Sequence, residues 1–173
     1  MQLYFSKDLG KQQIYVLYGL GGAGKTQIAL KFIEQSKSRF SSAFLIDTSS
    51  KETIDIGLKN IAFKKKIGET AEAAIQWLTS KHEEWLLLFD NADDPNIDMN
   101  KFLPRCNHGK IIITTRNPGL CVYAGENSHI DNMEEDDAVM LILKSAAVDN
   151  ISKNRTTSTA IVKVSSLIVG MRT

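Results

Sequence analysis

Short apolar runs alternate with helical patterns along most of the chain. Runs that are rich in β-branched or aromatic residues and end at a glycine or a polar side chain are typical of strands buried on both faces. Strands are predicted over residues 14–18, 43–47, 85–89 and 110–114. A shorter run over residues 128–130 is a candidate for a fifth strand.

Between these strands, apolar residues recur at the spacing of amphipathic helices. Helices are predicted over residues 25–35 and 69–80, and over 134–147, where an acidic first turn suits the positive end of the helix dipole. Another helix should begin at residues 49–52, where Ser49 and Glu52 have the spacing of a capping box. The residues expected to face the core are Ile28, Ala29, Phe32, Ile33, Ile54, Leu58, Ile61, Ala62, Ala71, Ala74, Ile75 and Leu78.

Buried strands that alternate with helices predict an α/β fold, a parallel sheet with helices on both faces and right-handed crossovers. The length of 173 residues suits one domain. We expect a lead-in over residues 1–13, a core domain over 14–148 and a C-terminal tail over 149–173. The tail has no clear hydrophobic period, so no element is predicted there.

Composition and charge argue against nucleic acid or a membrane as a partner. The chain has 21 Lys and Arg against 20 Asp and Glu, a net charge of +1. Its longest apolar runs are far shorter than the ~20 residues of a membrane span. Residues 1–8 lack the charged and apolar regions of a signal peptide. We therefore expect a cytoplasmic protein in which Cys106 and Cys121 are free thiols.

The clearest chemical signal follows the first predicted strand, where the chain reads Gly-Leu-Gly-Gly-Ala-Gly-Lys-Thr and then continues as a helix. In such a phosphate-binding loop, the P-loop, glycines let the backbone approach phosphates closely, and amide groups with the helix dipole favour the anion. Lys25 should reach the β- and γ-phosphates, and Thr26 should offer its hydroxyl to Mg²⁺. The residues predicted to bind the nucleotide are Gly19, Leu20, Gly21, Gly22, Ala23, Gly24, Lys25, Thr26 and Gln27.

A carboxylate for the magnesium ion is predicted at Asp90, directly after the strand over residues 85–89. The carboxyl ends of parallel strands form the edge where ligands bind in open α/β sheets. The next residue is Asn91, which cannot accept a proton from an attacking water. Asp93 and Asp94 could substitute as the base, although a solvated turn is the interpretation that we favour for both.

The strand over residues 110–114 leads into Thr115 and Arg116. An arginine at a strand end is usually only a surface charge, but at the ligand edge its guanidinium could reach a γ-phosphate and respond to its presence. Lys25 and Arg116 are therefore the candidate catalytic residues.

Together these three elements resemble the NB-ARC branch of the STAND class of P-loop NTPases, signalling switches of innate-immune and cell-death receptors. The resemblance covers about residues 14–147 and looks most like fungal-type members. It rests on Gly-Leu-Gly-Gly-Ala-Gly-Lys-Thr-Gln-Ile-Ala-Leu-Lys, on Leu-Leu-Leu-Phe-Asp-Asn-Ala-Asp-Asp and on Ile-Ile-Ile-Thr-Thr-Arg-Asn. The Thr-Thr-Arg element is the most discriminating of the three.

The resemblance implies a strand order of 5-1-4-3-2 and an adenine nucleotide bound by residues 19–26. It implies that Asp90 is the magnesium-coordinating Walker B acid and Arg116 the sensor arginine. It further implies that bound ADP stabilises a closed, inactive state, and that exchange for ATP opens the molecule for self-association. Slow hydrolysis would then reset the switch.

The sequence also departs from the family pattern. Many relatives have two acids where this chain has Asp90 and Asn91, which argues against rapid hydrolysis. Relatives carry a Gly-Arg element upstream of the first strand, and a Gly-Leu-Pro-Leu element and a His-containing winged-helix motif downstream. Residues 161–163 resemble the approach to the first downstream element, but 164–170 do not continue it. We therefore expect a truncated core whose tail is the start of a helical subdomain.

The leading hypothesis is a regulatory module that binds ADP or ATP with Mg²⁺ and whose output is a conformational change. One alternative is an active ATPase or phosphotransferase, with Asp93 or Asp94 as the base. Another is a folded fragment that no longer signals. His82, His108 and His129 lack the spacing of zinc ligands with one another or with the cysteines, so no zinc site is predicted.

Overall fold

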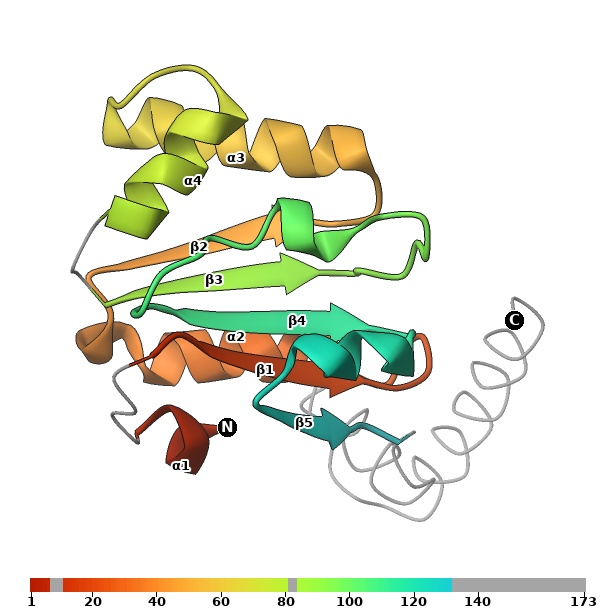
Figure 1. Cartoon of the computed structure of the whole chain (residues 1–173). Helices are drawn as coiled ribbons and strands as arrows, with labels where there is room; N and C mark the ends of the chain where they lie inside the picture. The colour runs from red at the N-terminus through yellow and green to blue at the C-terminus, as the bar shows by residue number, and fades with distance from the viewer. Residues whose placement is uncertain (7–10, 81–83, 132–173) are drawn as a thin grey trace, which may run out of the picture. The chain divides into compact units, whose positions relative to one another are not determined.

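The computed structural model describes residues 1–6, 11–80 and 84–131, of which Met1–Gly19 with Gly24–Ile130 forms one compact unit. In that unit a single sheet of five parallel strands has the order β2-β3-β4-β1-β5 (Figure 1). The strands are β1 (Gln13–Tyr18), β2 (Ser42–Asp47), β3 (Trp85–Asp90), β4 (Lys110–Thr115) and β5 (Glu126–His129). This confirms the predicted α/β fold and the implied strand order. The predicted helix over 134–147 and the tail over 149–173 lie outside the described residues.

Helices cover both faces of this sheet. Those of the described residues are α1 (Gln2–Phe5), α2 (Lys25–Gln35), α3 (Lys51–Lys65) and α4 (Ala71–Ser80), with short 3₁₀ helices η1 (Lys37–Arg39), η2 (Met99–Lys101) and η3 (Pro118–Tyr123). Helix α3 packs on β2 and on α4, whereas α2 packs against β3 and β4 (Figure 1). None of these helices has the length and apolar character of a bilayer span.

Two apolar layers form the core, because successive side chains of a strand point to opposite faces of the sheet. The layer beneath α3 and α4 contains Val16, Ile46, Leu87, Phe89, Ile111 and Ile113 from the strands. The layer beneath α2 contains Tyr15, Leu17, Leu86, Leu88 and Ile112 from the strands. Strands β3 and β4 contribute to both layers, which explains why their sequences are nearly uninterrupted apolar runs.

Helix α3 has its capping box one residue later than predicted. The Asp47 carboxylate accepts the Ser49 N–H at 2.9 Å, which holds Ser49 in the turn after β2. Ser50 is therefore the N-cap, and its hydroxyl accepts the Thr53 N–H at 3.1 Å. In return, the Thr53 hydroxyl accepts the Ser50 N–H at 3.1 Å. The predicted capping box of Ser49 and Glu52 is wrong, because the Asp47 carboxylate binds the Ser49 N–H and keeps Ser49 in the turn before the helix.

Other differences from the sequence expectations are small. Helix α4 begins at Ala71 rather than at Glu69, because the Thr70 hydroxyl accepts the Ala73 N–H at 3.2 Å at the start of the helix. Fewer residues of α2 are buried against the sheet than predicted, since Ile28 is 40% exposed. The fifth strand starts two residues earlier than its predicted range of 128–130.

Candidate functional site

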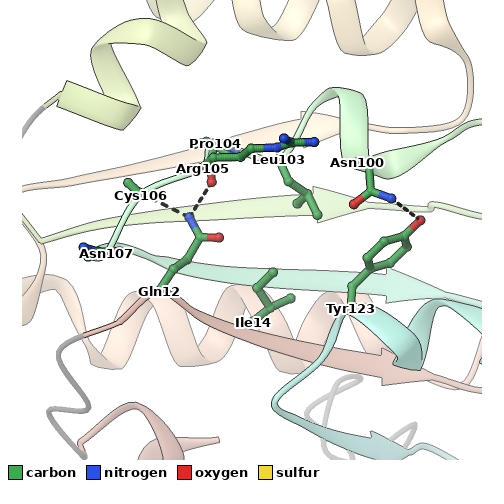
Figure 2. Close-up of a pocket in the computed structure, with 9 residues that line it drawn as sticks. All are labelled: Gln12, Ile14, Asn100, Leu103, Pro104, Arg105, Cys106, Asn107 and Tyr123. Carbon is green, nitrogen blue, oxygen red and sulfur yellow. Dashed lines mark hydrogen bonds between the residues drawn. The ribbon is translucent and has the colours of Figure 1, made fainter.

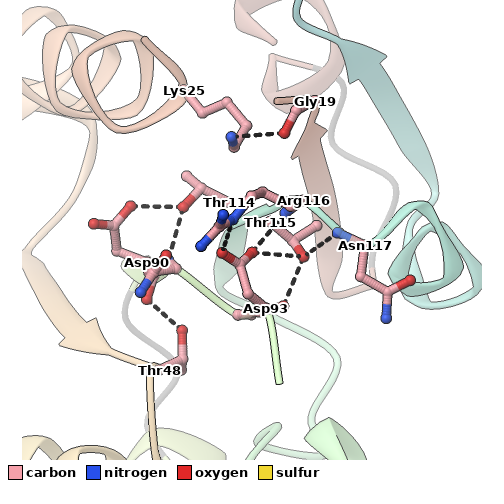
Figure 3. Close-up of polar contacts among 11 residues, drawn as sticks. Gly19, Lys25, Thr48, Asp90, Asp93, Thr114, Thr115, Arg116 and Asn117 are labelled. Atoms are coloured by element: carbon pink, nitrogen blue, oxygen red, sulfur yellow. Dashed lines mark hydrogen bonds and ion pairs between the residues drawn. The ribbon is translucent and has the colours of Figure 1, made fainter. Parts of the chain in front are cut away.

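The turn that follows β1 requires glycine at its first position. Gly19 has a φ of 147°, and a Cβ built on it would lie 2.1 Å from the Ile130 carbonyl oxygen. The Gly19 N–H donates to the Thr115 carbonyl oxygen at 3.2 Å. Its own carbonyl oxygen accepts a hydrogen bond from Lys25 Nζ at 2.8 Å (Figure 3). The start of the predicted P-loop is thus bonded both to β4 and to the lysine that begins α2.

A second glycine with left-handed backbone lies at the start of α2. Gly24 is the N-cap residue, with a φ of 87°. Having no side chain, it cannot cap the first-turn amides itself, and these amides and the helix dipole favour an anion there. Within the turn over residues 20–23, the Ala23 N–H donates to the Leu20 carbonyl oxygen at 3.4 Å. Gly22 in that turn has a φ of 82°. Gly21 has no positive φ, so its backbone does not adopt the predicted conformation that requires glycine.

Asp90 ends β3, and hydrogen bonds join it to three other elements. Its Oδ1 accepts the hydroxyl of Thr26, in the first turn of α2, at 2.7 Å and that of Thr114, in β4, at 2.6 Å. Thr48, which is buried directly after β2, donates to the Asp90 carbonyl oxygen from both its N–H and its hydroxyl. Figure 3 shows Asp90 between Thr114 and Thr48. The acid therefore lies at the carboxyl edge of the sheet, next to the start of α2.

The oxygen atoms of Thr26 and Asp90 fit a magnesium ion. Mg²⁺ prefers oxygen ligands and is usually held by one or two carboxylates together with waters and substrate phosphates. A threonine hydroxyl 2.7 Å from a carboxylate oxygen is a donor set of that kind. Over residues 1–6, 11–80 and 84–131, no group of three His, Cys, Asp or Glu side chains is arranged to hold a metal. His82 lies outside these residues.

Lys25 lies among the charged groups of this edge. Burial lowers the pKa of its ammonium group from the ordinary lysine value. The carboxylate of Asp93 raises this pKa, the guanidinium of Arg116 lowers it, and the carboxylate of Asp90 raises it. The start of α2, the loop that follows β3 and the residue after β4 therefore share one electrostatic neighbourhood.

Arg116 is held by Asp93 through two contacts. Its backbone N–H donates to Asp93 Oδ1 at 2.6 Å, and its side-chain Nε donates to Asp93 Oδ2 at 2.6 Å (Figure 3). The loop that carries Asp93 also follows the end of β4, since the Thr115 hydroxyl donates to the Ala92 carbonyl oxygen at 2.6 Å. The carboxylate of Asp93 thus forms an ion pair with Arg116, directly after β4.

The solvated turn predicted for Asp93 and Asp94 is confirmed for only one of them. Asp94 Oδ1 accepts the Asn96 N–H at 2.8 Å, which is a turn of that kind. The side chain of Asp93 is only 20% exposed and pairs with Arg116. The prediction is therefore wrong for Asp93, because the loop carries its carboxylate back to β4.

Sequence reasoning missed Thr48 and gave no role to Thr114. The Thr114 hydroxyl donates to Asp90 and also accepts the Asn91 N–H at 2.9 Å. Asn91 has a φ of 64°, a left-handed conformation that Asn adopts more readily than most residues. A search for hydroxyl residues at the carboxyl ends of the two strands that flank β3 would have located both threonines.

A hollow of 480 Å³ lies over the face of the sheet above β1 and β4, and extends from Gln12, just before β1, to Asn100 and Tyr123 (Figure 2). Four of its polar side chains take part in hydrogen bonds. Gln12 Nε2 donates to the Pro104 carbonyl oxygen at 2.7 Å and to Cys106 Sγ at 3.3 Å. Asn100 Nδ2 donates to the Tyr123 hydroxyl at 3.3 Å. None of the predicted site residues lines this hollow.

Comparisons with known proteins agree with the motifs. A profile of the NB-ARC domain matches residues 3–152. The chain is similar to a nucleotide-binding leucine-rich repeat (NLR)-like protein of Hyaloscypha variabilis, with 29% identity over 157 residues that cover 75% of this chain and 16% of the relative. The chain therefore spans about a sixth of the length of that relative.

Three solved structures to which the chain is similar share little sequence identity with it. A protein in the HORMA:CdnC:Trip13 complex of E. coli MS115-1 is 18% identical, with 90% of this chain and 60% of that chain covered and a TM-score of 0.46. A STAND protein of Pyrococcus horikoshii with a tetratricopeptide repeat sensor is 16% identical, with 88% and 25% covered and a TM-score of 0.44. PCH-2 of C. elegans is 11% identical, with 80% and 40% covered and a TM-score of 0.48.

The profile match extends over most of the chain, from before β1 to beyond β5. The sheet order is the one that the resemblance implied. The chain belongs to the NB-ARC domain family of nucleotide-binding domains in signalling proteins.

Proposed function

We propose that this NB-ARC domain binds ADP or ATP with Mg²⁺ at the carboxyl edge of its sheet and acts as a slow, nucleotide-dependent conformational switch in signal transduction. The observation that carries the proposal is the 2.7 Å hydrogen bond between the Thr26 hydroxyl and Asp90 Oδ1. Lys25 begins the same helix and donates to Gly19 at the end of β1. A hydroxyl, a carboxylate and an ammonium group in this arrangement suit a magnesium-bound phosphate chain.

Each charged residue of the edge has a distinct task in this proposal. Lys25 is the cation for the β- and γ-phosphates. Thr26 and Asp90 hold Mg²⁺, which neutralises phosphate charge when it is bound. Arg116 senses the γ-phosphate. The residues proposed to bind the nucleotide are Gly19, Leu20, Gly21, Gly22, Ala23, Gly24, Lys25, Thr26 and Gln27.

Slow hydrolysis is part of the proposal because the carboxylates near the site are engaged. Asp90 Oδ1 accepts two hydroxyl groups, and Asp93 is paired with Arg116. Asn91, next to Asp90, has an amide in place of a second carboxylate. A general base must lie close to the attacking water and be free to take its proton, and the sequence has an amide where a second acid would stand. We therefore expect bound ATP to be hydrolysed slowly.

Further elements of the proposal come from the family rather than from the contacts of this chain. They are the preference for adenine, self-association after nucleotide exchange, a role in innate immunity and a cytoplasmic location. The NLR-like relative is consistent with such a role, and the chain corresponds to 16% of its length. These properties are proposed for a protein that carries this domain together with further segments.

The proposal is tested by the affinity of the purified chain for ADP and ATP in the presence of Mg²⁺, together with its rate of ATP turnover. Lys25→Ala should weaken the binding of both nucleotides by about tenfold or more, the usual scale for a lost charge-assisted contact in a site. Lys31→Ala is the matched control, because Lys31 lies on the same helix in an exposed ion pair with Glu34. Its affinities should equal those of the wild type.

The outcomes separate the alternatives. A wild-type chain that binds neither nucleotide would contradict the proposal. Turnover of many molecules per second would instead favour an active ATPase or phosphotransferase. Tight binding with turnover of less than about one per minute is the expected result, well below the rate of typical enzymes.

A further inference from the structure

The ion pair between Asp93 and Arg116 uses both oxygen atoms of the carboxylate. Oδ1 accepts the Arg116 backbone N–H and Oδ2 accepts its Nε, each at 2.6 Å (Figure 3). The backbone contact fixes the carboxylate beside the end of β4, because a strand end has little freedom. The side-chain contact uses one of the five N–H donors of the guanidinium. The contact with the side-chain Nε is therefore easier to replace by another partner than the contact with the backbone N–H.

The two side chains are also buried to different extents. The Asp93 side chain is 20% exposed, whereas that of Arg116 is 53% exposed. The Asp93 N–H donates to the Asn91 carbonyl oxygen at 2.9 Å, so its backbone is held as well. Asp93 is thus an anchored anion, and the guanidinium is the more exposed partner of the pair.

Asp93 acts on the second cation of the edge too. Of the charged groups around Lys25, the carboxylate of Asp93 has the largest effect on the pKa of the ammonium group, which it raises. Both cations that a γ-phosphate would meet in the proposed site are therefore already partly neutralised by one acidic side chain. An incoming γ-phosphate would lie close to that negative charge and would compete with it for the guanidinium.

We propose that Asp93 is an internal counter-anion for Arg116 with which a γ-phosphate must compete, so that this residue biases the site toward nucleoside diphosphate over triphosphate. The inference rests on the proposed nucleotide site and specifies its regulation. ADP has no γ-phosphate and leaves the pair intact. ATP must draw the guanidinium away from Asp93 to use its Nε donor and its full positive charge, because the contact with Asp93 Oδ2 occupies that donor and partly neutralises that charge. The cost of that exchange falls on ATP alone.

The test is the ratio of ATP affinity to ADP affinity in Asp93→Asn, measured by calorimetry of the purified chain with Mg²⁺. Asn keeps Oδ1 as the acceptor for the Arg116 N–H, so the loop retains its backbone contact. Its amide replaces Oδ2 with a donor that repels Nε. We expect the ratio to move toward ATP by about two- to fivefold, the range for a partly exposed ion pair. ADP affinity should change by less than about twofold on the same basis.

Asp94→Asn is the matched control. It removes the same charge one residue away, but Asp94 accepts hydrogen bonds from Asn96 instead. Its affinity ratio should equal that of the wild type. Thermal unfolding of each variant verifies that it is folded, and Asp93→Ser provides a second variant without the carboxylate if Asp93→Asn does not fold.

A double-mutant cycle with Arg116→Ala tests whether the effect passes through the guanidinium. In the Arg116→Ala background, Asp93→Asn should move the affinity ratio by less than it does in the wild-type background, because only the influence of Asp93 on Lys25 remains. The proposal is overturned if Asp93→Asn weakens ATP binding, because Asp93 would then orient Arg116 for the phosphate. An equal gain in the Arg116→Ala background also overturns it, because Asp93 would then repel the phosphate directly. If the wild type binds neither nucleotide, the proposed function itself is wrong; if it binds both and the ratio does not move, only the role of Asp93 is lost.

Discussion

The hydroxyl of Thr26 donates to Oδ1 of Asp90 at 2.7 Å, although the two residues are 64 positions apart in the sequence. The same oxygen accepts the Thr114 hydroxyl at 2.6 Å. One carboxylate oxygen therefore joins the first turn of α2, the end of β3 and the end of β4. The proposed magnesium site is held in shape by hydrogen bonds within the fold.

The first prediction concerns Thr26 as a magnesium ligand. Thr26→Ala removes the hydroxyl, whereas Thr26→Ser keeps it and serves as the control. Thr26→Ala should weaken the Mg²⁺-dependent part of ATP binding by about tenfold or more, the usual cost of a disturbed metal site. The measurement is ATP affinity with Mg²⁺ and with EDTA. Equal Mg²⁺ dependence in Thr26→Ala and the wild type would exclude Thr26 as a ligand.

The second prediction concerns Thr114 and stability. Thr114→Val keeps the side-chain shape but leaves the Asn91 N–H without its acceptor and removes one donor to Asp90. We expect the free energy of unfolding to fall by about 1–3 kcal/mol, the cost of unsatisfied polar groups. Thr79→Val is the control, because its hydroxyl donates to the Ile75 carbonyl oxygen within the same helix and joins no other element of the described residues. Urea unfolding measures both, and equal losses would count against the role of Thr114.

The third prediction separates a steric collision from backbone strain. Gly19→Ala and Gly68→Ala both put a Cβ on a residue with a similar φ, 147° and 142°. The Cβ at Gly19 would meet the Ile130 carbonyl oxygen at 2.1 Å, whereas at Gly68 it would meet the Ala73 Cβ at 3.2 Å. Gly19→Ala should therefore destabilise the protein by more than Gly68→Ala, which should cost about 1–3 kcal/mol for strain alone. Thermal unfolding tests the order, and a reversed order would contradict the close approach at Gly19.

The fourth prediction concerns the two thiols. Burial raises the pKa of both Cys106 and Cys121 above the ordinary thiol value. A raised pKa lowers the fraction of thiolate at pH 8, and the thiolate is the reactive form. Both thiols should therefore react with iodoacetamide severalfold more slowly in the native protein than in urea, roughly in proportion to the lost thiolate. Mass spectrometry of Cys106→Ser and Cys121→Ser follows each remaining thiol, and faster reaction in the native state would contradict the effect of burial.

The sheet and the main site residues could be predicted because they depend on local patterns. Buried strands are visible as apolar runs, and the strand that ends at Asp90 is such a run. The P-loop glycines and Lys25 all lie within one short segment, residues 19–25. Asp90 follows from the rule that ligands bind at the carboxyl ends of parallel strands.

The contacts that sequence reasoning missed depend on which strands are neighbours. Thr48 bonds to Asp90 only because β2 lies beside β3, and Thr114 does so because β4 lies on the other side. Asp93 and Asp94 are identical in type and adjacent, yet only the first reaches Arg116. The capping box was predicted one residue early because two serines are consecutive and the role of Asp47 in the turn was not considered.

The central claim is tested most directly by the location of the bound nucleotide. Backbone amide NMR shifts of the labelled chain should be followed while MgADP is added. The account predicts that the largest changes fall on the amides of Gly19, Lys25, Thr26 and Asn91, at the carboxyl edge of the sheet. Changes confined to the amides of Gln12 and the other residues that line the hollow over the face of the sheet, or no saturable change, would contradict it.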